Sequence, residues 1–390
     1  MKVAIMTFVR AYNYGAVLQA YALNKVINEM GVDCETIDYF PHYFKSQYYL
    51  KKSPYINYRF PQNRQLKIWL FDNLYTFRLR SILKKRNRLF SLFIKRNIKL
   101  SKKRYYSKEA LNTIANTYDL YIAGSDQIWH NLWSDFDDSF FLCFVDKHKF
   151  KSSYAASFGF STIPKELESE YQDRLNRFDC ISVREQSAID IIKKTVGKTA
   201  TCECDPTILL RREQWELLVT QNNHSNYIFV YYINKADNIF KKAYELSIAK
   251  NLKVICLTSR VSEKIMMNDQ IESYNFTNVR IASPTDFLNL CFNAKYIITN
   301  SFHGTVFSII FHKQFMSEVF HCDGELNIRS KELLKKTGLC NRTVHSLSLL
   351  NIDDQIDWSV SDKYLEQLRH NGLQYISSLF TKEGLPGVNK

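Results

Sequence analysis

The sequence lacks an apolar run of the ~18 residues that are needed to cross a bilayer. Its first residues, MKVAIMTFV, form a short apolar run with no small-residue cleavage site after it, so they predict a first strand rather than a signal peptide. The nine cysteines are scattered and odd in number, and Cys202 and Cys204 do not have the spacing of zinc ligands. These absences predict a soluble protein with free thiols in a reducing cytoplasm.

Motifs typical of nucleotide or metal sites are also missing. There is no Walker A loop, no G-x-G-x-x-G and no G-x-S-x-G. Apart from His303, the histidines share no spacing typical of metal ligands; they are His42, His130, His148, His224, His312, His321, His345 and His370. We therefore expect no metal site and no tightly bound cofactor.

Basic residues are concentrated in one part of the chain. The net charge is +14 at pH 7, and residues 41–108 contain 19 Lys and Arg against a single acidic residue, Asp72. This segment therefore carries +18 and the remainder of the chain −4. Such a local excess favours a local anionic partner, and it argues against a nucleic-acid-binding protein that is basic throughout.

Short apolar runs alternate with amphipathic stretches on both sides of this segment, which predicts parallel sheets. In the first half we expect strands at residues 2–9, 32–39, 118–124, 151–158, 180–185 and 200–207, and helices at 16–30 and 186–195. In the second half we expect strands at 227–233, 252–259, 278–282 and 295–300, and a C-terminal helix at 361–380. Gly31 should end the first of these helices, and Ser283 should cap a helix that begins at Pro284.

At 390 residues the chain exceeds the roughly 250–300 residues at which a single core stops growing. We predict an α/β protein with two Rossmann-like doubly wound domains that face a cleft, with ligands at the carboxyl ends of the strands. The predicted domains are residues 1–178, with a basic helical insertion at about 41–108, and residues 179–350. Residues 351–390 hold the C-terminal helix.

Two polar clusters follow predicted strands of the first half. Asn13 and Gly15 precede a helix, where free N–H groups suit an anion or a sugar hydroxyl; the alternative is a turn with Gly15 at positive φ. In GSDQIW, residues 124–129, Asp126 and Gln127 can bind hydroxyls while Trp129 stacks on a sugar. The alternative is a helix cap at Ser125 and Asp126, with Trp129 in the core.

Two further clusters hold cations and an imidazole. Arg184, in SVRE, can bind a carboxylate or phosphate, or it can form a structural ion pair with the neighbouring glutamate. His303, in TNSFHG, lies between a predicted strand and a helix, where an imidazole can transfer protons, although a lone histidine is more often structural. Asn327 and Arg329 precede another predicted helix.

Residues 81–97 form an amphipathic pattern inside the basic segment. The apolar side chains share one helical face, and the basic ones, which are Lys84, Lys85, Arg86, Arg88, Lys95 and Arg96, mostly occupy the other. Such a helix suits an anionic lipid surface. The alternative is a solvated face on a packed helical insertion.

In chain order, these motifs resemble those of the polysaccharide pyruvyl transferase family. The resemblance rests on N-Y-G-A-x-L-Q (13–19), G-S-D-Q-I-W (124–129), S-V-R-E (182–185), D-P-T (205–207), N-S-F-H-G (300–304) and N-I-R-S (327–330). It implies a fold like that of GT-B glycosyltransferases, with a C-terminal helix that crosses back to the first domain. It also implies transfer of a pyruvyl group from phosphoenolpyruvate to sugar hydroxyls, with release of phosphate and formation of a cyclic ketal.

The resemblance assigns expected roles to the candidate residues. His303 becomes the acid and Arg184 a clamp on the donor. The remaining donor-binding candidates are Asn300, Ser301, Gly304, Thr305, Asn327 and Arg329. The acceptor-binding candidates are Asn13, Gly15, Gln19, Ser125, Asp126, Gln127 and Trp129. Some branches carry an arginine where this chain has Ser301, so the resemblance leaves Arg329 or Lys313 to supply that cation.

The same resemblance implies the setting of the reaction. Phosphoenolpyruvate is the co-substrate, and the acceptor is a sugar of a bacterial surface polysaccharide or of its lipid-diphosphate-linked precursor. The protein is then expected at the cytoplasmic face of the cell membrane, with the 41–108 segment on anionic lipid and no nucleic acid bound. The alternatives are a GT-B glycosyltransferase with a nucleotide-sugar donor and a non-catalytic binding protein of glycan assembly.

Overall fold

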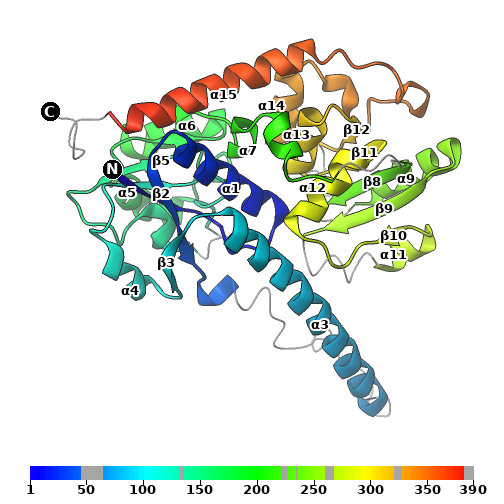
Figure 1. The fold of residues 1–390 in the computed structure, drawn as a ribbon, viewed down its shortest axis with the longest axis horizontal. Helices are drawn as coiled ribbons and strands as arrows, with labels where there is room; N and C mark the ends of the chain where they lie inside the picture. The colour runs from blue at the N-terminus through cyan, green and yellow to red at the C-terminus, as the bar shows by residue number, and fades with distance from the viewer. Residues whose placement is uncertain are drawn as a thin grey trace.

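The computed structural model describes residues 1–44, 65–131, 136–220, 226–233, 236–259, 268–319 and 327–381. The side chains of residues 65–79 and of Leu350 lie outside this description. Two parallel sheets, each covered by helices, lie side by side (Figure 1). This arrangement confirms the predicted α/β fold with two Rossmann-like domains.

The first sheet has the strand order β3-β2-β1-β4-β5, and every pair in it is parallel. Its strands are β1 (Lys2–Met6), β2 (Asp33–Tyr39), β3 (Leu100–Tyr105), β4 (Leu120–Ala123) and β5 (Phe150–Ser153). The elements of its connections are α1 (Tyr14–Glu29), α3 (Gln65–Asn97), α4 (Lys108–Leu111), η2 (Asn112–Ile114) and η3 (Asp138–Phe141). The central strands are buried, as a sheet covered on both faces requires.

The second sheet repeats this topology with the order β10-β9-β8-β11-β12, again parallel. Its strands are β8 (Tyr227–Tyr232), β9 (Lys253–Thr258), β10 (Thr277–Asn278), β11 (Tyr296–Thr299) and β12 (Gln314–Ser317). Its helices are α9 (Asp237–Lys250), α11 (Asn268–Ser273), α12 (Pro284–Asn293), α13 (Phe302–Ile310) and α14 (Ile328–Lys336), followed by η5 (Cys340–Arg342) and η6 (Leu349–Asn351). Ser283 caps α12 in a capping box, as the sequence predicts.

The structure places the change of domain later than residue 178. Strands β6 (Ser182–Val183) and β7 (Thr201–Cys202) continue the first sheet beyond β5, because Ser152 bridges to Cys180 and Ala156 to Val183. The helices η4 (Lys165–Leu167), α5 (Glu168–Leu175), α6 (Gln186–Val196), α7 (Pro206–Leu209) and α8 (Arg212–Glu216) accompany these strands. The second sheet begins only with β8.

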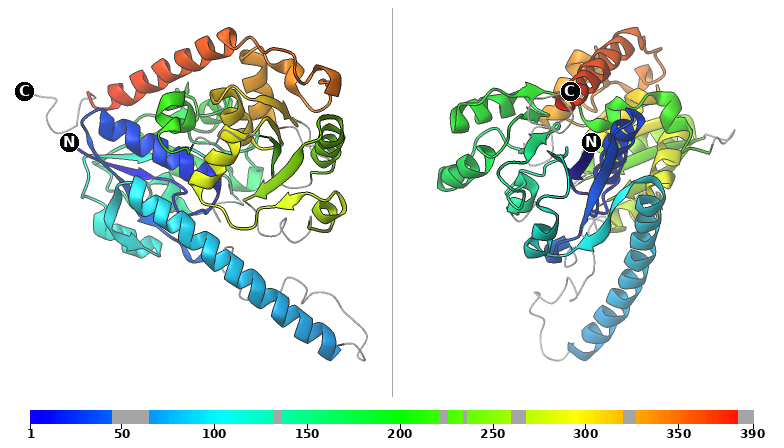
Figure 2. Two further views of the ribbon diagram at one scale, coloured as in Figure 1. Left: turned by 45° about the vertical axis from the view of Figure 1, so that its right-hand side comes forward. Right: turned by 60° about the vertical axis from the view of Figure 1, so that its left-hand side comes forward.

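Residues 45–64 of the predicted basic insertion lie outside the described residues, so the structure does not test this insertion as a whole. Its last part forms β3, an edge strand of the first sheet, whose Lys102, Lys103 and Arg104 side chains are exposed. Lysine on an edge strand discourages pairing with other chains, so a basic run is compatible with a strand here. The preceding α3 is a 33-residue helix that leaves the body of the protein, and all three ribbon views agree on this (Figures 1 and 2).

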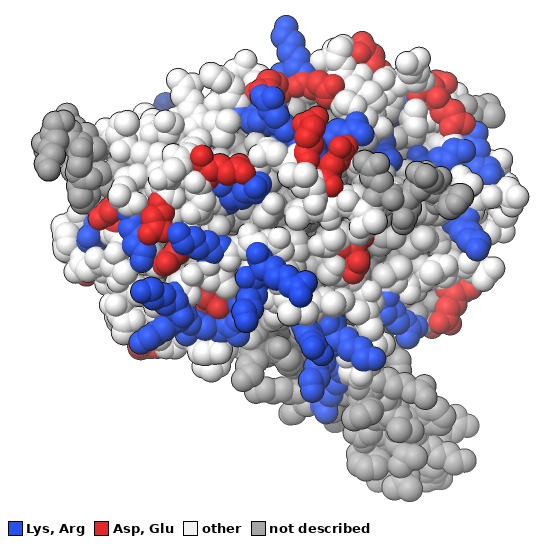
Figure 3. Space-filling view, in the orientation of Figure 1, with Lys and Arg blue, Asp and Glu red and all other residues white. Residues whose placement is uncertain are grey.

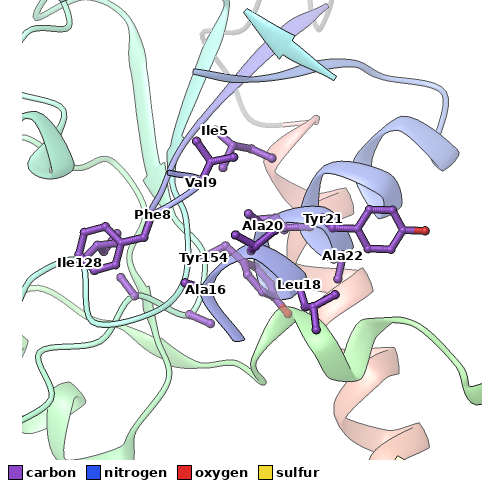
Figure 4. Close-up of a cluster of buried hydrophobic side chains, with 14 of the residues drawn as sticks. Ile5, Phe8, Val9, Ala16, Leu18, Ala20, Tyr21, Ala22, Ile128 and Tyr154 are labelled. Atoms are coloured by element: carbon purple, nitrogen blue, oxygen red, sulfur yellow. The ribbon is translucent and has the colours of Figure 1, made fainter. Parts of the chain in front are cut away.

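The core of the first domain forms between β1 and α1. Asn13 caps α1 by accepting a hydrogen bond from the Ala16 N–H, and Gly31 follows the end of the helix with φ of +80°. Alanines along α1 let the helix approach the sheet, and Ile5 and Val9 pack near it (Figure 4). The loop before α1 is therefore held rigidly at the carboxyl end of β1.

The C-terminal helix α15 (Ser359–Leu379) runs across both domains and ends on the first one (Figure 1). The Tyr375 hydroxyl lies 3.0 Å from Ser152 Oγ, and a Cβ on Gly372 would lie 2.5 Å from the Tyr154 hydroxyl. The helix therefore packs tightly on β5. Among the described residues, no helix has both the length and the apolar character that crossing a membrane requires.

Candidate active site

His303 lies where the two domains meet. It follows β11 in the first turn of α13, whose N-cap is Ser301, and its side chain is 10% exposed. A Cβ atom on Gly15, at the start of α1 in the first domain, would lie 2.1 Å from His303 Nδ1. Gly15 does not have a positive φ, so the predicted turn is not the reason for this glycine. The reason is the close approach of the imidazole.

Asp205 lies on the other side of the imidazole. Its Oδ2 is 3.4 Å from His303 Nε2, and its Oδ1 accepts hydrogen bonds from the Thr207 N–H at 3.0 Å and the Thr207 hydroxyl at 2.7 Å. Burial alone would raise the pKa of Asp205, but His303, Arg184 and Thr207 hold that pKa well below its usual value. Asp205 belongs to the D-P-T motif at 205–207, for which the sequence predicted no role in the site.

Arg184 is surrounded by carboxylates. Its Nη1 donates to Asp205 Oδ2 at 2.8 Å, its Nη2 lies 3.7 Å from Asp126 Oδ1, and its Nε lies 3.6 Å from Glu185 Oε1. Burial would lower the pKa of Arg184, but the three carboxylates raise it. The predicted pairing with the glutamate is therefore present. Because its charge is already matched, Arg184 organises the carboxylates at least as much as it offers a charge to a ligand.

Arg329 is the contrasting cation of the site. Its guanidinium lies 5.5 Å from the centre of the Phe302 ring, and the guanidinium of Arg184 lies 5.4 Å from the same centre. In the part of the chain that the structure describes, Arg329 forms no ion pair and no hydrogen bond. Burial, and then the charge of Arg184, lower its pKa to about 10, so it remains protonated at pH 7. An anionic ligand would relieve this cost.

His130 is a second imidazole near Arg329. Burial and the charge of Arg329 lower the pKa of His130 to about 4, so its ring is neutral at pH 7. A Cβ on Gly159 would lie 2.2 Å from Gln127 Nε2 and 2.9 Å from His130 Cδ2, so these two side chains gather around the glycine. The sequence offered no signal for His130, because a single histidine without a spacing pattern is uninformative.

Two of the predicted polar residues hold the loops of the site. Asp126 has a φ of 74°, and its Oδ1 accepts the Gln127 N–H at 2.9 Å, so no helix begins here and its carboxylate faces Arg184. Asn13 caps α1, and its Nδ2 donates to the Ser259 hydroxyl of the second domain at 3.0 Å. Both lie at the carboxyl ends of strands, as the ligand rule for such folds expects.

Three predicted acceptor residues lie inside the first domain instead. Gln19 donates to Thr7 Oγ1 and to the Ala16 carbonyl, Ser125 donates to the Ala155 carbonyl, and both are fully buried. Trp129 is also fully buried, with its indole stacked on Phe141. The structure therefore supports the alternative of a core tryptophan, and it leaves no ring face free for a sugar.

Replacing Trp129 by phenylalanine is expected to lower the free energy of unfolding by roughly 1–3 kcal/mol, because packing and the bond from its Nε1 to the Phe140 carbonyl are lost. The KM for any sugar acceptor should not change, because the indole is inaccessible. Urea unfolding and steady-state kinetics on the same preparation measure both quantities. A rise in acceptor KM with unchanged stability would contradict this placement.

Most of the predicted donor residues shape the loop around His303. Asn300 Oδ1 accepts the Ile233 N–H, Ser301 Oγ accepts the Gly304 N–H, and Thr305 pairs with Ser317. A Cβ on Gly304 would lie 2.3 Å from Thr299 Oγ1. Asn327 caps α14 and donates to the Asn300 carbonyl. These groups are positioned to build the loop rather than to bind a ligand.

Lys313 does not replace the arginine that is absent at Ser301. It follows the end of α13 opposite to His303, and its ammonium lies 5.3 Å from the centre of the Phe292 ring. Burial and the charge of Arg212 lower the pKa of Lys313. Of the two cations that the sequence offered for this role, only Arg329 lies at the site.

A family model described as polysaccharide pyruvyl transferase matches residues 13–317. Among solved structures, UDP-GlcNAc 2-epimerase from Methanocaldococcus jannaschii aligns with a TM-score of 0.55 at 9% identity and covers 98% of this chain and 100% of its own. UDP-N-acetylglucosamine 2-epimerase from Rickettsia bellii aligns with a TM-score of 0.52 at 12% identity, covering 97% and 96%. At such identities the likeness shows the fold alone, and it agrees with the predicted GT-B-like arrangement. Curated proteins gave no match.

Proposed function

The chain belongs to the polysaccharide pyruvyl transferase family, a family of transferases, and from this premise we propose that it transfers a pyruvyl group from phosphoenolpyruvate to two hydroxyls of a sugar. The observation that carries the proposal is Arg329, a partly exposed cation without an anionic partner among the described residues, on the same aromatic ring as Arg184. The donor carries a carboxylate and a phosphate, and Arg329 offers the charge that such a ligand requires.

The reaction needs a proton at one carbon of the donor and nucleophiles at its neighbour. Protonation of the methylene gives a methyl group and an oxocarbenium-like centre at the enol carbon. Two hydroxyl oxygens of the sugar bond to that carbon, and the bond to the phosphate oxygen breaks. One hydroxyl hydrogen replaces the proton given to the methylene, and the other leaves with phosphate. A positioned acid and a fixed cation are therefore the main requirements on the protein.

The described residues match these requirements in distinct roles. His303 supplies the proton, and Asp205, 3.4 Å from its Nε2, orients the imidazole. Arg329 binds the phosphate or the carboxylate of the donor. Arg184 fixes Asp205 and Asp126 in place, so that Asp126 faces the region where a sugar would lie. Gly15 leaves the space that the imidazole occupies between the two domains.

The direct test is phosphate release from phosphoenolpyruvate with a panel of galactosides, glucosides and N-acetylmannosaminides, read together with product mass. Release coupled to the mass gain of one pyruvyl ketal on one sugar would establish the reaction and name the acceptor. No release, together with thermal stabilisation by UDP but not by phosphoenolpyruvate, would overturn the proposal in favour of a glycosyltransferase.

We also propose that the protein meets its acceptor at an anionic lipid surface. Lys and Arg side chains gather on one face over β3 and the described part of α3 (Figure 3). The exposed basic residues of α3 and β3 include Lys84, Lys85, Arg88, Lys95, Arg96, Lys102 and Lys103. Each cation near an anionic leaflet contributes about 1 kcal/mol, so this face favours an anionic membrane surface.

Changing Lys84, Lys85 and Arg88 together to glutamine is expected to weaken binding to phosphatidylserine-containing liposomes on the order of 100-fold, from about 1 kcal/mol per lost cation. Liposome flotation measures this binding. The matched control changes the exposed Lys193, Lys194 and Lys241 to glutamine, which removes the same charge elsewhere. Equal losses in both triple variants would show that only net charge matters and would contradict a dedicated face.

A further inference from the structure

Arg86 does not lie on the basic face of α3 to which its sequence neighbours belong. It is fully buried, and its Nη2 donates to the Tyr12 carbonyl of the first domain and to the Ser259 carbonyl of the second domain, the latter at 3.0 Å. Its guanidinium lies 4.8 Å from the centre of the Phe90 ring and 5.7 Å from that of Tyr14. One side chain of α3 therefore contacts both domains at their junction.

This burial is costly in a way that points to a role other than stability. Among the described residues, Arg86 Nε and Nη1 have no hydrogen-bond partner, and no carboxylate forms an ion pair with Arg86. A buried charge with unsatisfied donors destabilises a fold relative to an apolar side chain of similar size. A buried charge that is kept despite its cost to stability is expected at positions that serve function.

The loop that leads to Gly15 makes further contacts with the second domain next to Arg86. Besides Tyr12, which Arg86 contacts directly, Asn13 donates to the Ser259 hydroxyl at 3.0 Å, and the Tyr14 hydroxyl donates to the Ala282 carbonyl at 3.3 Å. The Tyr14 ring also stacks on Phe287 of α12 with 5.2 Å between the ring centres. Asn13 and Tyr14 therefore tie the first domain directly to the second, and Tyr12 is joined to it through Arg86.

The residue that follows this loop is Gly15, against which the His303 ring lies. A shift of the loop by a fraction of an ångström would therefore move the floor of the site relative to the imidazole. Displacements of about 1 Å in such positions reduce rates by roughly 100-fold. The contacts of this loop therefore link the junction of the two domains to the placement of His303.

We propose that Arg86 is a positioning residue: it pins α3 to the domain junction and thereby sets the approach of the Gly15 loop to His303. When an anionic surface binds the exposed face of α3, any resulting shift of the helix is transmitted to the Gly15 loop through Arg86. The effect on rate rests on the proposed pyruvyl transfer, whereas the structural effect on the loop does not. The two are measured separately.

The test compares Arg86→Met and Arg86→Lys with the wild type. We expect Arg86→Met to lower kcat by about 10- to 100-fold with little change in the KM for phosphoenolpyruvate, because the donor site itself is intact. Arg86→Lys, which keeps a charge and a donor, should restore part of the rate. We also expect phosphatidylserine vesicles to stimulate turnover by the wild type and not by Arg86→Met.

Arg177→Met is the matched control. Arg177 Nη2 also donates to two carbonyls, those of Cys143 and Val145 at 3.1 and 2.8 Å, but both lie within the first domain. This variant should lose stability and keep the wild-type kcat. If both methionine variants lower kcat equally, or if a folded Arg86→Met keeps the wild-type kcat and vesicle response, the proposal is overturned.

Hydrogen exchange gives a readout that needs no substrate. In Arg86→Met, amides of residues 12–17 and 301–305 should exchange faster than in the wild type, while Arg177→Met should leave them unchanged. Unchanged exchange in Arg86→Met would overturn the proposal whether or not the protein uses phosphoenolpyruvate. If Arg86→Met does not fold, Arg86→Gln, which removes the charge and keeps a polar side chain, is measured in the same way, and wild-type exchange and kcat in that variant would overturn the proposal.

Discussion

Replacing Arg329 by methionine is expected to lower kcat/KM for phosphoenolpyruvate by on the order of 100- to 1,000-fold. A charge-assisted bond to an anionic ligand contributes roughly 1.5–3 kcal/mol, and a preorganised cation acting in the transition state adds to this. Arg329 forms no ion pair among the described residues, although Glu185, Asp126 and Asp205 lie near enough to raise its pKa, so it can still form an ion pair with the donor. Stability should change little or rise, because a partly buried charge without an ion pair among the described residues is removed.

Steady-state kinetics with varied phosphoenolpyruvate measures this effect, and Arg174→Met is its control. Arg174 lies with its guanidinium 3.7 Å from the centre of the Phe136 ring, so the control also removes an arginine from an aromatic ring. It should leave kcat/KM within about threefold of the wild type, as expected for a change remote from the chemistry. If Arg329→Met retains wild-type kcat/KM, Arg329 does not bind the donor, and the main structural support for the proposed function is lost.

The topology and the region of the site could be predicted because the sequence shows where the strands end, and ligands of such folds bind at the carboxyl ends of strands. His303, Arg184 and Asp126 each come directly after an apolar run, and parallel strands bring such residues to one edge of a sheet. The contact between Gly15 and His303 was not predictable, since it depends on how two domains meet. A place for Asp205 in the site could have been predicted, because it lies in one of the motifs and follows a predicted strand.

The side chains that the sequence analysis misplaced share one cause, which is burial against another domain or layer. Trp129 follows polar residues, but Phe141 of η3 and Phe158 after β5 enclose it. Arg86 lies in a basic run, yet it is three residues after Leu83 and four before Phe90, which is the spacing of the apolar face. Residues 100–105 were assigned to the insertion because exposed lysines obscured an edge strand.

Replacing Asp205 by asparagine is expected to have the largest combined effect on activity and stability. Breaking a buried ion pair costs roughly 3–5 kcal/mol when one charge is left without its partner, and the value here should lie near the lower limit because Asp126 and Glu185 remain beside Arg184. Loss of the carboxylate beside His303 should also reduce kcat by at least about 100-fold, as for other oriented acid groups.

The pH dependence separates this ionic role from simple packing. Since the pKa of Asp205 in the folded protein is held below that in the unfolded chain, about 3.9, its ionised form stabilises the fold above that pH. This stabilisation is lost as the pH falls through the folded pKa. The difference in unfolding free energy between wild type and Asp205→Asn should therefore shrink below about pH 4 and be constant above it.

Urea unfolding between pH 3 and pH 8 measures this difference. The control is Asp137→Asn, another buried carboxylate, which accepts the Tyr39 hydroxyl at 2.7 Å and the Ser139 N–H at 2.9 Å and lies remote from His303. It should destabilise the protein without the loss of kcat. A difference for Asp205→Asn that does not vary with pH would show that this carboxylate acts through packing, and it would leave His303 without its orienting partner. The pH dependence of unfolding therefore tests the ionic role of Asp205 beside His303, and this test does not require the acceptor sugar to be known.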